Sequence, residues 1–95
     1  MIIVNPPFEF EWDKGNDIKN FLKHGVSNEE IEQIFWDENK KLFEDEIHSD
    51  EEDRYILLGK TFDEKLLFVV FTLRGRKIRV ISARSLNKRE ISLYK

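Results

Sequence analysis

Three arginines of this sequence have the chemistry to act on a phosphodiester. Arg54, Arg79 and Arg84 each combine a permanent positive charge with a planar fork of donors that matches phosphate oxygens. Arg79 stands in the middle of an apolar segment, where a charge is costly to bury unless it pairs or faces a cleft. If the three arginines converge on one concave sheet face, they can stabilise the phosphorane that forms during RNA cleavage. The alternative is that Arg79 pairs with a carboxylate from the first half of the chain.

The two halves of the chain carry opposite charge. Residues 1–53 have 5 lysines and 16 carboxylates, whereas residues 54–95 have 11 lysines and arginines and 3 carboxylates. The net charge of −3 hides this division. Either the basic half binds phosphate, or the two halves pack together and neutralise each other.

The composition indicates one domain with a real core. The chain has 95 residues, of which 40% are hydrophobic and 13% aromatic. It has no cysteine, which excludes disulfides and thiolate metal sites and favours a reducing cytoplasm. The longest apolar run, Leu66–Phe71, is too short to span a bilayer, and the first residues show no export signal. We therefore expect a cytoplasmic protein without membrane contact.

The first third of the chain predicts one short strand and two helices. Phe8–Trp12 alternates aromatic and acidic side chains, which is the period of a half-buried strand. Asp13 is a suitable N-cap for a helix that runs to His24 and ends at Gly25. We expect this helix to bury an apolar stripe formed by Ile18, Phe21 and Leu22.

A second helix is expected to follow immediately. Ser27 and Glu30 have the spacing of a capping box, in which each residue bonds the other's backbone N–H. The buried face of this helix comprises Ile31, Ile34 and Phe35. Both helices need a further surface to cover, and a sheet is the natural one.

The rest of the chain supplies that sheet. The expected strands are Lys41–Phe43, Tyr55–Leu58, Leu66–Phe71 and Ile78–Arg84. Leu66–Phe71 is apolar without alternation, which indicates a central strand covered on both faces. Asn87 and Glu90 can cap a last helix over residues 88–95. Residues 1–95 thus predict a single α+β domain, with two N-terminal helices packed on a mostly antiparallel sheet of four to five strands and a short C-terminal helix.

His48 is a further candidate for chemistry. It lies in Glu44–Asp53, where seven of ten residues are acidic, a composition typical of a solvated loop. Its imidazole can also act as a general acid or base, because its unperturbed pKa lies near the working pH. A metal bound by Asp45, His48 and Asp50 is disfavoured, since the spacing matches no recognised site. We expect no metal and no cofactor.

Several short motifs in a fixed order carry a resemblance to a known family. They are Phe10-Glu11-Trp12-Asp13, Lys23-His24-Gly25-Val26-Ser27, Phe43-Glu44-Asp45 with His48, Asp53-Arg54-Tyr55 with Gly59, Val69-Val70-Phe71-Thr72, and Ile78-Arg79-Val80-Ile81-Ser82-Ala83-Arg84 followed by Glu90 and Tyr94. Their order and spacing, from about residue 8 to residue 94, resemble the BrnT family. The resemblance implies a RelE-like fold and a ribonuclease toxin of a type II toxin–antitoxin pair. It also implies RNA cleavage without metal, and a ribbon-helix-helix antitoxin, BrnA, that neutralises the toxin and binds promoter DNA.

The resemblance assigns roles to residues of this sequence. Arg54, Arg79 and Arg84 sit at arginine positions of the family and are expected to be catalytic, with His48 as a candidate acid or base. RNA contacts are expected from Lys23, His24, Arg74, Arg76 and Tyr94. Trp12 is either a core residue or a base-stacking platform.

The last expected helix departs from the family pattern. Residues 87–95 are less basic than the arginine-rich helix of BrnT-like chains, which predicts modest affinity for RNA. Ile91 and Leu93 look more like a docking surface for a small basic antitoxin. A non-catalytic co-repressor that acts only by holding a DNA-binding antitoxin is therefore the alternative function.

Overall fold

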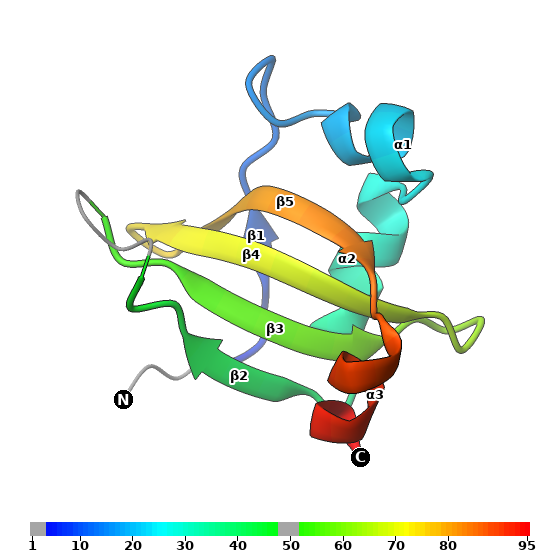
Figure 1. The fold of residues 1–95 in the computed structure, drawn as a ribbon. Helices are drawn as coiled ribbons and strands as arrows, with labels where there is room; N and C mark the ends of the chain where they lie inside the picture. Colours follow the sequence, from blue (N-terminus) through cyan, green and yellow to red (C-terminus); the bar gives the residue numbers. More distant parts are fainter. Residues whose placement is uncertain (1–3, 48–51) are drawn as a thin grey trace.

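The computed structural model describes residues 4–47 and 52–95. Five strands form one sheet in the order β1-β5-β4-β3-β2 (Figure 1). The strands are β1 (Glu9–Phe10), β2 (Lys41–Glu44), β3 (Tyr55–Lys60), β4 (Leu66–Arg74) and β5 (Lys77–Ser85). The helices are α1 (Lys19–His24), α2 (Asn28–Ile34) and α3 (Lys88–Tyr94). β1 pairs with β5 in parallel and all other pairs are antiparallel, so the expected α+β fold is confirmed.

The core lies between the sheet and α2, which Figure 1 shows behind the strands. Phe35, which ends α2, is 1% exposed, and its ring contacts Phe8, Phe10 and Phe71. Such edge-on aromatic contacts add specificity to the burial of apolar area. The expected buried face of α2 is confirmed.

β4 is the central strand, as the apolar run predicted. Leu67, Val69 and Phe71 face α2 and are each 0% exposed. The expected coverage of both faces is wrong, because Phe68 and Val70 on the opposite face are only half-buried. A β-bulge between Val70 and Phe71 shifts the register against β5.

The capping boxes expected at the starts of α2 and α3 are both present. Ser27 Oγ accepts from the backbone N–H of Glu30, whose carboxylate accepts from the N–H of Ser27. Asn87 and Glu90 repeat this arrangement at α3. Each cap satisfies backbone donors that have no partner within the helix.

The prediction for α1 is wrong in its start and in its orientation. The helix begins at Lys19, and the preceding Ile18 adopts a left-handed backbone with φ 50°. The stripe expected to be buried is exposed, at 55% for Ile18, 56% for Phe21 and 77% for Leu22. The residue of α1 that faces the protein is Asn20, which is 1% exposed.

The edge of β5 explains this inversion. β1 pairs only with Lys77 and Ile78, so the backbone of β5 beyond them needs other partners. Side chains supply these partners: Asn16 Nδ2 donates to the Val80 carbonyl at 3.1 Å and Lys19 Nζ to the Ile81 carbonyl at 3.1 Å. Asn20 Oδ1 accepts from the N–H of Ala83 at 2.9 Å. α1 therefore presents polar side chains to a sheet edge, and its apolar stripe faces outward.

α3 is tied to the segment after α2 by a partly buried hydrogen bond. Tyr94 is 8% exposed, and its hydroxyl donates to Asp37 Oδ2 at 2.6 Å. The same carboxylate oxygen accepts from the backbone N–H of Lys60. Burial and the neighbouring Asp37 carboxylate raise the pKa of Tyr94 to about 12. The bond thus fixes α3 at the end of the sheet.

Candidate functional site

The face of the sheet opposite α2 carries the candidate arginines, and we call it the open face. Alternation along β4 places Phe68, Val70 and Thr72 there. Arg79 and Arg84 of β5 are five residues apart, and the β-bulge between them brings both to this face. α3 lies at one end of this face, where Leu58, the cross-strand neighbour of Phe68, is 1% exposed. Among the described residues no helix lies over the other end, near Val70 and Arg79, so a ligand can approach there.

Arg79 is held on the open face by two carboxylates. Asp13 pairs with it through two bonds, Nη1 to Oδ2 at 2.8 Å and Nη2 to Oδ1 at 3.0 Å, and Glu11 Oε1 lies 3.1 Å from Nη1. The Arg79 side chain is 15% exposed. The hydrogen bonds with Asp13 raise the pKa of Arg79 and lower that of Asp13. Arg79 therefore pairs with the acidic half, which was the alternative expected from the sequence.

A tight turn after β1 shapes the Asp13 side of this pair. Asp13 Oδ1 also accepts from the N–H of Gly15 at 2.8 Å, and the N–H of Asp13 donates to Asn16 Oδ1 at 2.8 Å. Asn16 is 3% exposed and its Nδ2 donates to the Glu11 carbonyl. Two bonds and a buried amide thus fix the carboxylate that orients Arg79.

Glu11, Asp13 and Gly15 were not recognised as site residues from the sequence. The sequence did contain one signal for Glu11. The alternation that predicted the first strand places Glu11 on the opposite face of that strand from the aromatic side chains. Knowing that β1 pairs with β5 would have completed the inference. Trp12 is half-buried against the core, and its Nε1 donates to Glu32 at 2.7 Å, which favours the core role over base stacking.

Arg54, which precedes β3, and Arg79 of β5 are aligned across the sheet, with Thr72 of β4 between them. The register of β3 and β4 pairs Tyr55 with Phe71, so Arg54 comes opposite Thr72, which itself pairs with Arg79. The bond from Thr72 Oγ1 to the Asp53 carbonyl at 2.7 Å supports this register. On the other side, the Asp45 N–H donates to the Arg54 carbonyl at 2.8 Å and extends the pairing of β2 with β3. Two strand spacings separate the backbones of Arg54 and Arg79 by about 10 Å. Both long side chains can therefore reach one phosphate between them.

A small acidic cavity adjoins Arg54. Its volume is about 120 Å³, and its lining residues are Glu44, Glu46, Asp53, Arg54 and Tyr55. Burial, with Asp53 and Glu44 nearby, raises the pKa of Tyr55. This cavity surrounds Arg54 with carboxylates, much as Glu11 and Asp13 surround Arg79.

Arg84 lies apart from the other two arginines. It pairs with both oxygens of Glu90 at 2.7 Å, and its guanidinium stands 4.1 Å from the centre of the Phe68 ring. Phe68 is four residues from Thr72 along β4, which places Arg84 about 13 Å from the level of Arg79. The structure thus brings two of the predicted catalytic arginines together and keeps the third at a distance.

The residues expected to bind RNA do not form one surface. Lys23 and His24 are exposed at the end of α1. Arg74 is 51% exposed and lies 3.4 Å from Glu11 Oε1, beside Arg79. Tyr94 is buried, and its hydroxyl donates to Asp37. His48, and with it the acid–base prediction, lies outside the described residues.

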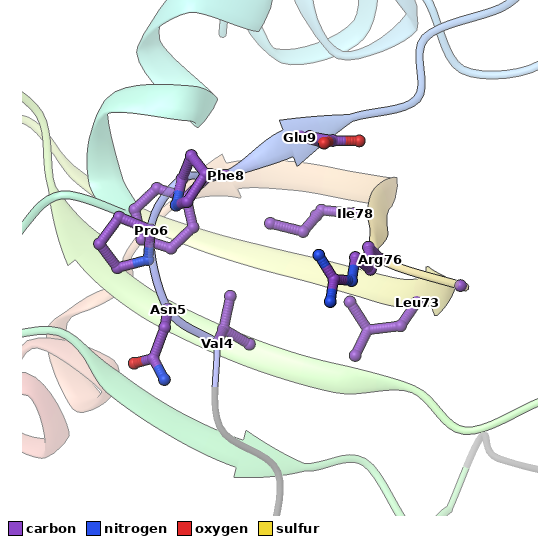
Figure 2. Close-up of a pocket in the computed structure, with 10 residues that line it drawn as sticks. Val4, Asn5, Pro6, Phe8, Glu9, Leu73, Arg76 and Ile78 are labelled. Atoms are coloured by element: carbon purple, nitrogen blue, oxygen red, sulfur yellow. The ribbon is translucent and has the colours of Figure 1, made fainter.

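Arg76 borders a separate cavity on the core side of the sheet. This cavity has a volume of about 450 Å³ and apolar walls that include Val4, Phe8, Leu73 and Ile78. Figure 2 shows the Arg76 side chain turning back from the β4–β5 hairpin between Leu73 and Ile78. The volume lies in the range of small-molecule sites.

Within residues 4–47 and 52–95, no three histidine, aspartate or glutamate side chains gather as metal ligands. His48 and Asp50 of the disfavoured metal site lie outside these ranges. In the same ranges, no helix has the length and apolar character to cross a membrane.

The chain is a small α+β protein that presents arginine–carboxylate pairs on one face of a five-stranded sheet. Residues 12–90 match the family model described as ribonuclease toxin, BrnT, of type II toxin-antitoxin system. None of the curated proteins compared with the chain matches it. The chain belongs to the BrnT family, so the resemblance seen in the sequence is confirmed. The family implies an RNA substrate and an antitoxin partner.

Proposed function

We propose that this chain is an endoribonuclease toxin that cleaves RNA without a metal ion in the cytoplasm. The observation that supports the proposal best is the Arg79 guanidinium, fixed by Asp13 on the open face and level with Arg54. A preorganised cation at the place where charge develops is the largest single contribution in many enzymes. Orientation by a carboxylate prevents the guanidinium from turning away before the substrate arrives.

The proposed reaction is an internal transfer within the RNA strand. The 2′-oxygen attacks the adjacent phosphorus, the 2′-OH proton passes to a base, and the 5′-oxygen of the next nucleotide leaves with a proton from an acid. The products are a 2′,3′-cyclic phosphate and a free 5′-OH. Arg54 and Arg79 stabilise the extra negative charge of the phosphorane between them. The fork of Arg79 suits the equatorial oxygens of this intermediate.

His48 is the proposed acid or base for the proton transfers. It belongs to the connection between β2 and β3. The backbone hydrogen bond from the Asp45 N–H to the Arg54 carbonyl joins the two ends of this connection. The chain therefore tethers His48 within six residues of Arg54. Arg84 is too far from Arg79 to share its phosphate, so we assign it to a second phosphate of the same strand.

We assign RNA contacts to the predicted side chains that are exposed to solvent. Arg74 stands beside Arg79 and is assigned a contact near the centre. Lys23 and His24, at the end of α1, and Arg76, beside the cavity on the core side, are assigned contacts with more distant parts of the RNA. We assign no RNA contact to Tyr94, because its ring is buried and its hydroxyl is bound to Asp37.

The proposed partner is a ribbon-helix-helix antitoxin similar to BrnA. The acidic first half of the chain attracts a small basic protein over long range, which speeds encounter. The toxin reaches promoter DNA only through this antitoxin, because its own net charge is −3.

A co-repressor without catalytic activity is the second candidate function. The observation in its favour is that Arg79 and Arg84 both already pair with carboxylates, which neutralise much of their charge. A phosphate must then share donors with Asp13 or Glu90. The co-repressor function predicts intact RNA in the presence of the purified chain.

Cleavage of a defined RNA by the purified protein separates these functions. Arg79→Ala is expected to lower the cleavage rate by about 100-fold or more, the usual loss for one charge-stabilising group. Arg79→Lys is also expected to be impaired, because a point charge does not replace a planar fork. Arg89→Ala, which changes an exposed arginine of α3, serves as the matched control. Circular dichroism verifies that each variant is folded.

Three results would contradict the proposal. Full activity of a folded Arg79→Ala protein would remove Arg79 from the mechanism. Loss of wild-type cleavage in EDTA would replace the metal-free reaction by a metal-dependent one. Absence of any cleavage by the wild-type protein would favour the co-repressor.

A further inference from the structure

The outer face of α1 is an apolar surface that the fold itself does not use. Ile18, Phe21 and Leu22 have the spacing of one helical stripe, and each is more than half exposed. The inner side of the helix is occupied by Asn20 and Lys19, which bond the edge of β5. Folding of the chain alone therefore gives no reason for large apolar residues at these three positions.

The backbone at Ile18 strengthens this point. Its φ of 50° lies in the left-handed region, which a β-branched residue adopts only at a cost in free energy. Glycine or asparagine would take this conformation more easily. An exposed and strained isoleucine destabilises the isolated domain, so its apolar side chain is explained by a contact that the isolated domain lacks.

The charges around the stripe indicate what covers it. α1 contains Lys19, Lys23 and His24 and no carboxylate. Residues 14–24 hold three of the five lysines of the first 53 residues and one carboxylate, Asp17, which accepts from Asn28 Nδ2. A segment with apolar side chains and at least one carboxylate beside them complements this surface, whereas RNA offers no apolar side chains.

A groove lies at the C-terminal end of α1. It has a volume of about 380 Å³ and begins at His24 and Gly25, two to three residues after Leu22. Its apolar lining includes Leu66, Leu86 and Ile91. Stable complexes bury about 800 Å² on each partner, more than three side chains supply, so a partner on the stripe has to extend into such a groove.

We propose that the antitoxin covers this surface, which consists of the α1 stripe and the adjoining groove, with an amphipathic segment. Apolar residues of that segment pack on Phe21 and Leu22, and a carboxylate lies near Lys23. An antitoxin that is basic overall can carry such a segment outside its DNA-binding part. This inference rests on the proposed function, which supplies the type of partner. It does not depend on any catalytic residue.

The test measures the affinity of the ribbon-helix-helix protein encoded next to this chain, by titration calorimetry. The double variant Phe21→Ser/Leu22→Ser is expected to bind about 100-fold more weakly, because apolar anchors at the centre of an interface dominate its affinity. Lys23→Glu is expected to weaken binding, because it places a like charge beside the carboxylate of the segment. Phe43→Ser on β2, the opposite edge of the sheet, is the matched control and should bind like the wild type. Leu93→Ser tests the exposed end of α3, the competing surface.

The outcomes distinguish this proposal from the proposed function. Wild-type affinity in the double variant, or a loss confined to Leu93→Ser, would overturn the docking surface and leave the toxin–antitoxin pair intact. Unchanged antitoxin binding with lost RNA cleavage would assign the stripe to RNA and also overturn the proposal. Failure of the wild type to bind would remove the proposed partner and the docking surface together. Thermal unfolding verifies the fold of each variant.

Discussion

Gly15 lies directly against the guanidinium of Arg79. A Cβ at position 15 would stand 2.8 Å from Arg79 Nη2 and 3.2 Å from Asp13 Oδ1. Real Cβ atoms do not approach another heavy atom so closely, so the orientation of the central cation depends on a residue without a side chain. Asp13 holds the guanidinium from one side, and Gly15 leaves the space for it.

Gly15→Ala is expected to lower RNA cleavage by about 10- to 100-fold, because small displacements of a catalytic group have effects of this size. The free energy of unfolding should fall by less than about 1 kcal/mol, since the flexible end of Arg79 can move aside. Cleavage rates and urea unfolding measure the two effects. Lys14→Ala, at the exposed neighbouring position, should leave both unchanged. An equal loss of stability and activity would show that Gly15 serves the fold and not the site.

Val69→Asp is expected to unfold the domain. Val69 is 0% exposed at the centre of β4, and an unpaired carboxylate there costs on the order of 4 kcal/mol or more. Val70→Asp is the matched control, because Val70 is half-buried on the open face and its carboxylate can reach water. Circular dichroism melting should separate the two variants. Similar melting temperatures would show that the two faces of β4 are assigned wrongly.

Tyr94 should make stability depend on alkaline pH. Its pKa of about 12 exceeds the ordinary value of 10.0, so the neutral hydroxyl stabilises the fold fully below pH 10. This contribution is lost as the pH rises from 10 to 12. Tyr94→Phe should therefore lower the free energy of unfolding by about 1–2 kcal/mol at pH 8 and remove the loss in this window.

Asp37→Asn gives an independent measure of the same bond. It should lower the pKa of Tyr94 in an absorbance titration, yet leave it above 10.0, because burial is the larger cause of the shift. Ser92→Ala, an exposed change on α3, should alter neither stability nor titration. A pKa of Tyr94 that stays near 12 in Asp37→Asn would show that the carboxylate has no part in it.

Ile18→Asn is expected to raise the free energy of unfolding by about 1 kcal/mol, because asparagine tolerates the left-handed backbone. The same change should weaken antitoxin binding, since it removes one member of the apolar stripe. Urea unfolding and titration calorimetry on the same samples measure both. A less stable Ile18→Asn protein would indicate that the side chain contributes to the fold more than its backbone costs.

Local signals in the sequence predicted the parts of the fold that local interactions determine. The pairs Ser27–Glu30 and Asn87–Glu90 fixed two helix starts, because a capping box involves only neighbouring residues. The apolar run of β4 identified the central strand. α1 was placed wrongly because its orientation depends on distant backbone groups of β5, which no helical period within residues 13–24 can reveal.

The sequence predicted which arginine is central to the candidate site, but not which residues pair with it. The charge of Arg79 in an apolar strand identified it, and the sequence left open whether phosphate or carboxylate would face it. The answer depends on the parallel pairing of β1 with β5, which brings Asp13 across 66 residues of chain. The role of His48 stays a prediction, since it lies outside the described residues.

The parallel pair of β1 and β5 also sets an order of events during synthesis. The ribosome completes β1 first, and β1 has to wait for β5 before it can join the sheet. Glu11 and Asp13 therefore remain without their cation until residue 79 has left the ribosome. Under the proposed mechanism, a nascent chain is therefore inert until β5 has emerged and paired with β1.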